Sequence, residues 1–236
     1  MGSNVCFERS FESCAPTDPL TMAEPTLASS SPPTETGTKT RLLDAAERLF
    51  ADFGFEGTSM RAVTQAAGTA VSAANYHFGS KQELLRAVLQ RRIEPINRER
   101  IARLAALLRP LSVEAVIDAF VRPTFEARAA SKEVSAGFRQ VAARLFSDPP
   151  EVVSSLRRDL LEPVILRFVE ALGTTLPDRD PAALRVGFHF VVGTLVHVIG
   201  GHLDGARDEL ALDDEAVLAQ LVAHCAAGLR SGGAIS

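Results

Sequence analysis

The sequence is poor in the residues that mark disulfide-linked or metal-binding domains. Its 236 residues include no tryptophan, one tyrosine (Tyr76) and three cysteines, Cys6, Cys14 and Cys225. The cysteines have no spacing that suits a metal site, and an odd number cannot all pair within one chain. This usage fits a reduced cytosol. Cys225 lies in an apolar helical pattern, so we expect a small buried hydrophobic residue there.

The sequence also lacks an excess of positive charge. Lys and Arg total 25 against 29 Asp and Glu, which gives a formal net charge of -4. This balance disfavours a protein that binds polyanions over its whole surface. A local DNA-binding face remains compatible with it, because such a footprint depends on where the basic residues lie.

No segment is typical of a membrane span or a secretory signal. The N-terminal residues contain no basic region followed by an apolar run. The most apolar stretch, residues 186–201, is shorter than a bilayer requires and contains His189, Thr194 and His197. The pattern instead predicts a deeply buried or interface helix in a cytoplasmic protein that does not contact a membrane.

Strand-like alternation and internal repeats are absent from the sequence as well. Ala, Leu, Arg and Val dominate, a bias that favours helix over sheet and predicts an all-α fold. Residues 1–38 contain Pro, Ser, Thr and Glu without a hydrophobic period, which predicts a disordered N-terminal arm. Whether translation starts at Met1 or at Met22 stays open.

Helical periodicity begins at Lys39. Apolar residues then recur on one broad face of a helix, at Leu42, Leu43, Ala46, Leu49, Phe50 and Phe53. Gly54 is placed to end this helix in a left-handed conformation. Thr58 or Ser59 is expected to cap a second short helix.

A very short third helix is predicted between a turn at Gly68 and a capping box formed by Ser80 and Glu83, which opens a fourth helix. Ala74 and Phe78 are four residues apart and are expected to point inward. The opposite face carries small or polar residues that point outward: Val71, Ser72 and Asn75. This arrangement predicts a helix-turn-helix reading head.

The remaining residues, 91–236, are predicted to form longer helices. They are expected at about 95–108, 112–130, 132–147, 150–173, 181–203 and 213–230, which makes roughly nine helices in the chain. Pro95 is expected to bend or restart a helix, and Pro123 to kink one.

The stretches "RLLDAAERLFADFGFEGTSMRAVTQAAG" and "NYHFGSKQELLRAVL" resemble the tetracycline-repressor family of bacterial transcription regulators. The likeness runs from about Thr40 to Leu89 and rests on several elements in order: helix-ending glycine, Thr-Ser cap, Ala-Gly turn, aromatic-His-Phe and Ser-Lys. It implies a DNA-binding head at 39–90 and a helical ligand-binding and dimerisation domain at 91–236. It also implies a homodimer on a double-stranded DNA operator. No cofactor is expected, and no metal site either, because His189 and His197 are eight residues apart with no carboxylate or cysteine nearby at ligand spacing.

The resemblance also implies which residues contact DNA, and these are Thr58, Arg61, Val71, Ser72, Ala73, Asn75, Tyr76, His77 and Lys81. Arg61 is placed like the family's base-reading residue, and a guanidinium suits the O6 and N7 atoms of guanine. Val71 or Ala73 suits a thymine methyl group. Tyr76, His77 and Lys81, like the cap at Thr58, match positions that usually hold phosphate.

Some alternatives remain open at these positions. Arg61 is otherwise a solvated charge, and Tyr76 is otherwise a wedge in the core with its hydroxyl at the rim. The chain departs from the family at Ala70, where many members have a Ser or Asn cap. Thr69 is then expected to cap the third helix one residue earlier, at a cost of about 0.5–1 kcal/mol if it caps poorly.

The C-terminal half is similar to a branch that includes fatty-acid-responsive repressors of lipid metabolism genes, chiefly through "LRVGFHFVVGTLVH". A small apolar or amphipathic effector, such as a fatty acid or acyl-CoA, is the implied ligand. The candidate ligand-binding residues are Phe120, Phe138, Arg139, Phe168, Phe188 and His189. Phe125, Phe146, Phe190 and Arg144 are further candidates, although core packing or a solvated charge accounts for each as well.

The last two helices are expected to form the dimer contact. The candidate interface residues are Val191, Leu195, Val217, Leu218, Leu221, Val222 and Cys225, which would give a two-fold four-helix packing. The expected function is therefore a ligand-controlled transcription repressor. Two alternatives are kept: an activator or ligand-independent DNA-binding regulator, and, more distantly, a small helical enzyme, for which no catalytic pattern is found.

Overall fold

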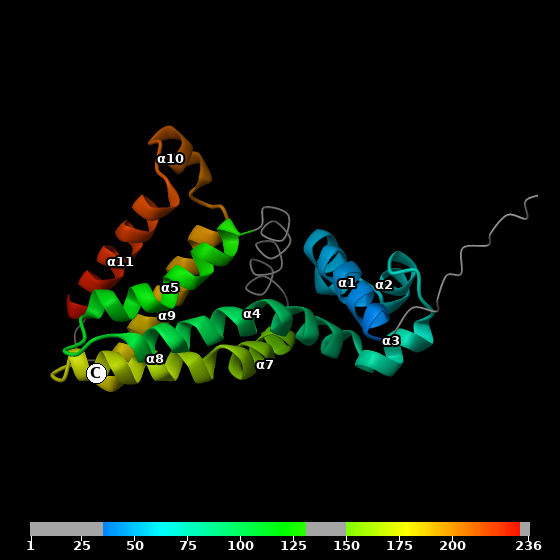
Figure 1. Cartoon of the computed structure of the whole chain (residues 1–236), viewed down its shortest axis with the longest axis horizontal. Coiled ribbons are helices and arrows are strands. Elements are labelled where there is room, and N and C mark those ends of the chain that lie inside the picture. The colour runs from blue at the N-terminus through cyan, green and yellow to red at the C-terminus, as the bar shows by residue number, and fades with distance from the viewer. Residues whose placement is uncertain (1–34, 131–149, 232–236) are drawn as a thin grey trace, which may run out of the picture. The chain divides into compact units, whose positions relative to one another are not determined.

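The structure is a computed structural model that describes residues 35–130 and 150–231. Within these two ranges every regular element is an α-helix, so the predicted all-α class is confirmed (Figure 1). The expected helix at 132–147 and most of the expected arm at 1–38 lie outside the described residues.

The N-terminal helices are α1 (Glu35–Gly57), α2 (Met60–Ala66) and α3 (Val71–Phe78). Gly54 has a φ of 72° within α1, so the chain kinks where a glycine was expected to take a positive φ. Only a residue without a Cβ adopts this conformation at no steric cost. Gly54 thus ends the first helical segment, as expected, and a second short segment beyond the kink runs to Gly57.

A buried apolar cluster, the head core, joins these helices to the first half of α4 (Lys81–Ala106). Its larger members include Leu42, Phe50, Phe55, Val63, Phe78, Leu84, Val88 and Leu89. Phe53 was expected on this face but is 59% exposed. The chain kinks at Gly54, and Phe55 beyond the kink stacks on Phe50 instead, with ring centroids 6.2 Å apart.

Helix α4 begins where the sequence predicts but does not break where expected. The hydroxyl of Ser80 accepts the backbone N–H of Glu83 at 3.1 Å, which caps the first turn. Pro95 lies inside the helix without restarting it. A proline removes one intrahelical hydrogen bond, but Ile93 and Ile96 on either side are buried, and their packing holds the helix continuous.

A partly buried ion-pair cluster ties α1 to α4. Glu47, whose side chain is 8% exposed, accepts hydrogen bonds from Arg91 and, at 2.9 Å, from the Nε atom of Arg92. Arg91 also contacts the exposed Asp44, with 2.7 Å between Nη1 and Oδ1. A buried carboxylate is tolerated when guanidinium groups satisfy its oxygens in this way.

The sensor domain consists of the second half of α4 and the helices that follow it, namely α5 (Val113–Ala129), α7 (Pro150–Leu160), α8 (Glu162–Thr175), α9 (Pro181–Ile199), α10 (Asp204–Glu209) and α11 (Asp214–Ser231). The helix expected at 150–173 is divided at Leu161, just before Pro163. Proline suits the first turn of a new helix. The short α10 was not predicted, because its segment is rich in turn-forming residues.

Helix α9 is long and apolar enough to cross a membrane by length and composition alone. The core helix of a soluble protein passes the same test, and one face of α9 is buried in the sensor core with α5, α8 and α11. The buried residues are Leu184, Phe188, Val191, Val192, Leu195, Val198 and Ile199. Only 33% of its most apolar window is buried, so the helix is not deeply buried on all sides, and the expectation of an interface on its other face stays a prediction.

We expect Glu47→Gln to lower the free energy of unfolding by about 1–3 kcal/mol, because the amide leaves two guanidinium groups without their shared carboxylate. Asp44→Asn is the matched control: it removes a partner of Arg91 from an exposed position and should cost less than about 1 kcal/mol. Urea unfolding followed by circular dichroism measures both. Equal losses in the two variants would contradict the role given to Glu47.

Candidate functional site

Helix α3 presents one face to solvent and holds the other in the head core. Ala74 and Phe78, four residues apart, are both buried. Val71, Ser72 and Asn75 are exposed on the other side. The inward and outward faces predicted from the spacing are therefore confirmed. A short helix with a small, polar outer face is able to enter the major groove of DNA.

The C-terminal end of α3 combines an exposed tyrosine with a buried phenylalanine. Tyr76 is 77% exposed and is not a wedge in the core. Its ring meets that of His77 edge-on, with centroids 5.3 Å apart, and the His77 ring is tilted against Phe78. His77 and Ala73 are half-buried. Phe78 thus anchors the end of the helix while the Tyr76 hydroxyl stays accessible.

The start of α3 has no side-chain cap. Ala70 is the N-cap residue and its side chain has no hydrogen-bonding group. Thr69 was expected to cap instead, but its hydroxyl donates to the carbonyl oxygen of Ala70 at 3.4 Å. Among residues 35–130 and 150–231, the first backbone N–H groups of α3 therefore have no side-chain cap. Such groups are satisfied by water or by a bound anion such as phosphate.

Arg61 is the second residue of α2, which begins after a well-formed cap. The Ser59 hydroxyl accepts the N–H of Ala62 at 3.1 Å. The Arg61 side chain is exposed, and it makes no hydrogen bond or ion pair within the described ranges. A guanidinium in this condition is available to a base edge or a phosphate.

Two expected phosphate contacts differ from the prediction. Thr58 is buried, and its hydroxyl lies 2.8 Å from the carbonyl oxygen of Gly54 and 3.0 Å from that of Leu49. It closes the kinked end of α1 and is not available to DNA. The Lys81 ammonium donates to the carbonyl oxygen of Phe55 at 2.9 Å and lies over the Phe55 ring. Only its remaining donors are able to meet a phosphate.

In the sensor domain, three expected ligand-binding residues pack on one another. Phe120, Phe168 and Phe188 are fully buried, and the Phe120 centroid lies 5.1 Å from Phe168 and 4.8 Å from Phe188. They form part of the sensor core rather than the wall of an open cavity. Phe125 is also buried in this core.

The other candidate ligand residues are not brought to this cluster. Phe138, Arg139, Arg144 and Phe146 lie outside the described residues. His189 is on the surface, 4.0 Å from Glu162. Among the residues that the structure describes, no three of His, Cys, Asp or Glu gather in a way that would hold a metal ion.

The sequence reasoning missed a buried cation beside the aromatic cluster. Arg100 on α4 donates from Nε to the carbonyl oxygen of Phe120 at 2.8 Å and from Nη2 to the Thr124 hydroxyl at 2.9 Å. Its Nη1 donates to Asn97 at 3.0 Å, and its guanidinium stacks 3.9 Å from the Phe120 ring centre. Burial lowers the pKa of Arg100 to about 9, since none of these acceptors is charged.

A signal for Arg100 was present in the sequence. Arg100 lies four residues after Ile96 and four before Leu104, so it shares the apolar face of α4. Long charged side chains are usually solvated. Arg100 has charged neighbours in "NRERIARL", so its burial was not predicted.

The residues expected at the dimer interface lie inside the protomer. All seven are buried in the sensor core: Val191, Leu195, Val217, Leu218, Leu221, Val222 and Cys225. The stripe is apolar, as predicted, and it packs α11 and α9 against the chain's own helices; Val191 and Cys225 also line the hollow between α9 and α11. Burial also raises the pKa of the Cys225 thiol, which agrees with the expected small hydrophobic residue.

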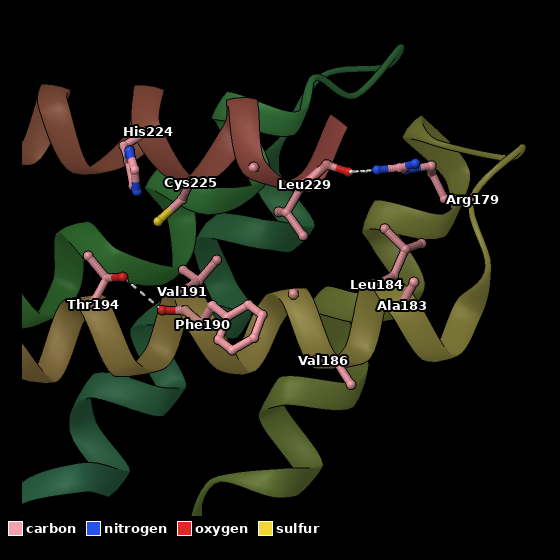
Figure 2. Close-up of a pocket in the computed structure, with 12 residues that line it drawn as sticks. Arg179, Ala183, Leu184, Val186, Phe190, Val191, Thr194, His224, Cys225 and Leu229 are labelled. Carbon is pink, nitrogen blue, oxygen red and sulfur yellow. Dashed lines mark hydrogen bonds between the residues drawn. The ribbon is translucent and has the colours of Figure 1, made fainter. Parts of the chain in front are cut away.

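The outer faces of α9 and α11 carry a different set of residues. A cavity of about 410 Å³ lies between the two helices. Figure 2 shows Phe190 and Val186 on its α9 side. Phe190 is 70% exposed. Gly187 lies under this cavity, where a Cβ would be 2.8 Å from Cδ2 of Leu229. An exposed aromatic ring beside an apolar hollow marks this face as a candidate contact surface.

Two sequence families match the chain. The profile of bacterial regulatory proteins of the tetR family matches residues 42–88, which hold the helix-turn-helix. The profile of the tetracyclin repressor-like C-terminal domain matches residues 118–228 of the sensor domain. The two matches together extend over more than half of the chain. No curated protein matches it.

Solved structures of regulators share the fold. The fatty acid degradation regulator FadR of Bacillus halodurans is 18% identical, with a TM-score of 0.58 over 82% of this chain and 96% of that one. A TetR-like transcriptional regulator of Rhodococcus sp. RHA1 is 20% identical, with a TM-score of 0.57 over 83% and 97%. The regulator PfmR of Thermus thermophilus is 21% identical, with a TM-score of 0.52 over 80% and 97%.

We expect Arg61→Ala to weaken binding to a DNA fragment selected by the protein roughly ten- to hundredfold and to relax one base preference, because a bidentate guanine contact is lost. Its melting temperature should hardly change, since Arg61 has no partner within the described residues. Arg98→Ala, at another exposed arginine that makes no ion pair in those ranges, is the matched control. Fluorescence anisotropy measures both; an affinity within twofold of the unaltered protein would refute the assignment.

Proposed function

Because the chain belongs to the tetracycline-repressor family of bacterial transcription regulators, we propose that it is a ligand-responsive repressor that binds a pseudo-palindromic operator as a homodimer. The observation that carries the proposal is the exposed outer face of α3, at Val71, Ser72 and Asn75, held in place by buried Ala74 and Phe78. The protein acts in the cytoplasm, where its DNA target lies.

The proposed contacts divide into base reading and phosphate binding. Arg61 reads a guanine, and the exposed side chains of Val71, Ser72 and Asn75 read neighbouring base edges. Tyr76 and the uncapped start of α3 hold phosphates, which fix the register of the head without reading sequence. Ala73, His77 and Lys81 contribute at the edge of this surface, whereas the buried Thr58 supports it from within. The runner-up, an activator or ligand-independent regulator, uses the same DNA contacts.

The proposed switch runs through α4 and its contact with the junction of α7 and α8. Arg86 on α4 pairs with Asp159 on α7 at 2.7 Å, and Asn97 donates to the carbonyl oxygen of Leu160 at 2.7 Å. Leu161 packs against both the head core and the sensor core. An effector that binds better to one setting of these contacts shifts the spacing of the two heads, because only differential affinity moves such an equilibrium.

The proposed dimer forms through the outer faces of α9 and α11. Phe190 of each protomer fits the hollow between α9 and α11 of the other, which gives a self-complementary contact about a two-fold axis. The exposed Phe190 and Val186 support this assignment. It replaces the buried stripe first expected at the interface.

The proposed effector is apolar or amphipathic, with a fatty acid or acyl-CoA as the leading class. Two observations support it. The sensor domain is built largely from Phe, Leu, Val and Ile, and one structural neighbour bears the name of a fatty acid degradation regulator. A small helical enzyme is the distant alternative, and no catalytic arrangement in the described residues favours it.

We expect Phe190→Asp to raise the dimer dissociation constant by roughly thirtyfold or more, because a desolvated aromatic contact is replaced by a charge. Phe53→Asp is the matched control, since Phe53 is also an exposed phenylalanine but lies on α1. Sedimentation velocity at several concentrations measures the change. A dimer that survives Phe190→Asp unaltered places the interface elsewhere.

We also expect long-chain acyl-CoA or a free long-chain fatty acid to release the operator at micromolar concentration, on the order of ordinary small-molecule affinities. Release is followed by the anisotropy of labelled operator DNA, with a short-chain acid of the same charge as the control. If neither compound changes the affinity for operator DNA up to its solubility limit, the proposal of a lipid effector is wrong. Expression of the neighbouring genes in a deletion strain separates repressor from activator.

A further inference from the structure

A second hollow lies on the sensor domain, away from α9 and α11. It is a groove of about 700 Å³ between the last turns of α4, the following connection, and α8. Its apolar side chains come from all three segments, with Leu104, Leu107, Leu111 and Val164 half-buried along it. Ile101, also in the groove, is 39% exposed. The groove therefore leaves apolar area in contact with water that a bound apolar chain would cover.

Two arginines at this groove have no ion-pair partner among the described residues. Arg109 and Arg167 line it, both are exposed, and neither makes an ion pair or side-chain hydrogen bond within residues 35–130 and 150–231. The contrast with neighbouring arginines on the same surfaces is clear: Arg103 on α4 contacts Glu99 and Glu126. Of the groove-lining residues only Glu170 is acidic, so the rim carries a net positive charge.

We propose that this groove binds an amphipathic anion, with its hydrocarbon chain along Leu104, Leu107 and Val164 and its carboxylate or phosphate head met by Arg109 and Arg167. The proposal rests on the proposed function, because it gives the effector a site and a head group. The complementarity is of two kinds: apolar area for the chain, and guanidinium donors that match a planar carboxylate or a phosphate.

A ligand in this position would act directly on the connecting helix. Ile101, Leu104 and Ala105 belong to α4, whereas Pro163, Val164 and Arg167 belong to the start of α8. The chain of the ligand therefore lies between the helix that carries the DNA-binding head and the helix that begins after the α7–α8 junction. A bound chain holds the α4 and α8 sides of the groove apart. The ligand therefore binds most tightly to the position of α4 in which the groove is open, and it shifts the equilibrium toward that position.

The test uses the full-length protein and two probes below their critical micelle concentrations: sodium dodecanoate and dodecyl phosphate. Isothermal titration calorimetry measures binding to the unaltered protein, to the double variant Arg109→Gln with Arg167→Gln, and to Arg98→Gln. Loss of the two charge-assisted contacts should weaken binding about tenfold or more, whereas Arg98→Gln should stay within twofold. Decyltrimethylammonium, which has a chain but the opposite charge, should not bind.

The two probes distinguish a carboxylate from a phosphate head group. The probe whose affinity falls more in the double arginine variant carries the head group that the site matches better. Ala171→Leu fills the groove without altering a charge and should also weaken binding, with circular dichroism confirming an intact fold. Binding that is unaffected by the arginine and Ala171 variants overturns the groove as the site. An absence of binding by both probes overturns it equally.

The operator assay separates this inference from the proposed function. If dodecanoate releases DNA equally from the unaltered protein and the double arginine variant, the effector lies elsewhere, so the groove is refuted and the ligand-responsive repressor stands. If the probes bind in an arginine-dependent manner but leave operator affinity unchanged, the groove stands as a ligand site and the coupling to DNA is refuted.

Discussion

The structure depends on the sharing of one continuous helix, α4, by two hydrophobic cores. Leu84 and Leu89 belong to the head core, whereas Leu104 packs on the sensor core. Because the helix passes through Pro95 without restarting, its backbone hydrogen bonds link the two ends mechanically. The buried Arg100 adds to this constraint, since its hydrogen bonds and its stacking on Phe120 fix the second half of α4 to α5. The proposed switch relies on this continuity, because a displacement of α4 in the sensor domain would be carried to the head.

The contacts that surround α4 differ in strength in a way that suits a switch. Glu47 is nearly buried and serves two arginines, so α1 and α4 hold together as a unit. The pair between Arg86 and Asp159 is exposed, and exposed pairs contribute only about 0–1 kcal/mol. Glu47 thus joins α1 to α4 more firmly than that ion pair joins α4 to α7, so the proposed effector would need only a few kcal/mol of differential affinity to bias the setting of the head.

Sequence patterns predicted the features of the fold that depend on neighbouring residues in the chain. The short α3, its inward Ala74 and Phe78, the Ser80 cap and the positive φ of Gly54 all follow from periodicity and from single-residue stereochemistry. The roles of Thr58 and Arg100 did not. The apolar face of α4 hinted that Arg100 is buried, but the hydrogen-bond partners of both residues are set by the tertiary fold. The break at Leu161 was missed for the opposite reason: apolar periodicity continues across it although the helix does not.

The apolar stripe on α9 and α11 illustrates why apolar periodicity alone does not identify an interface. The wide stripe through Leu218 and Leu221 is buried in the protomer's own core, which needs such an apolar face to cover α5 and α9. The outer edge of α9 and α11 is the part that remains for a partner. It is narrow, and it contains glycines, which weaken a helix. It also carries the exposed Phe190. A large aromatic side chain kept in water beside a hollow has a physical cost in the monomer. In the proposed dimer, association about a two-fold axis would remove that cost twice, once in each protomer, and this would supply part of the driving force.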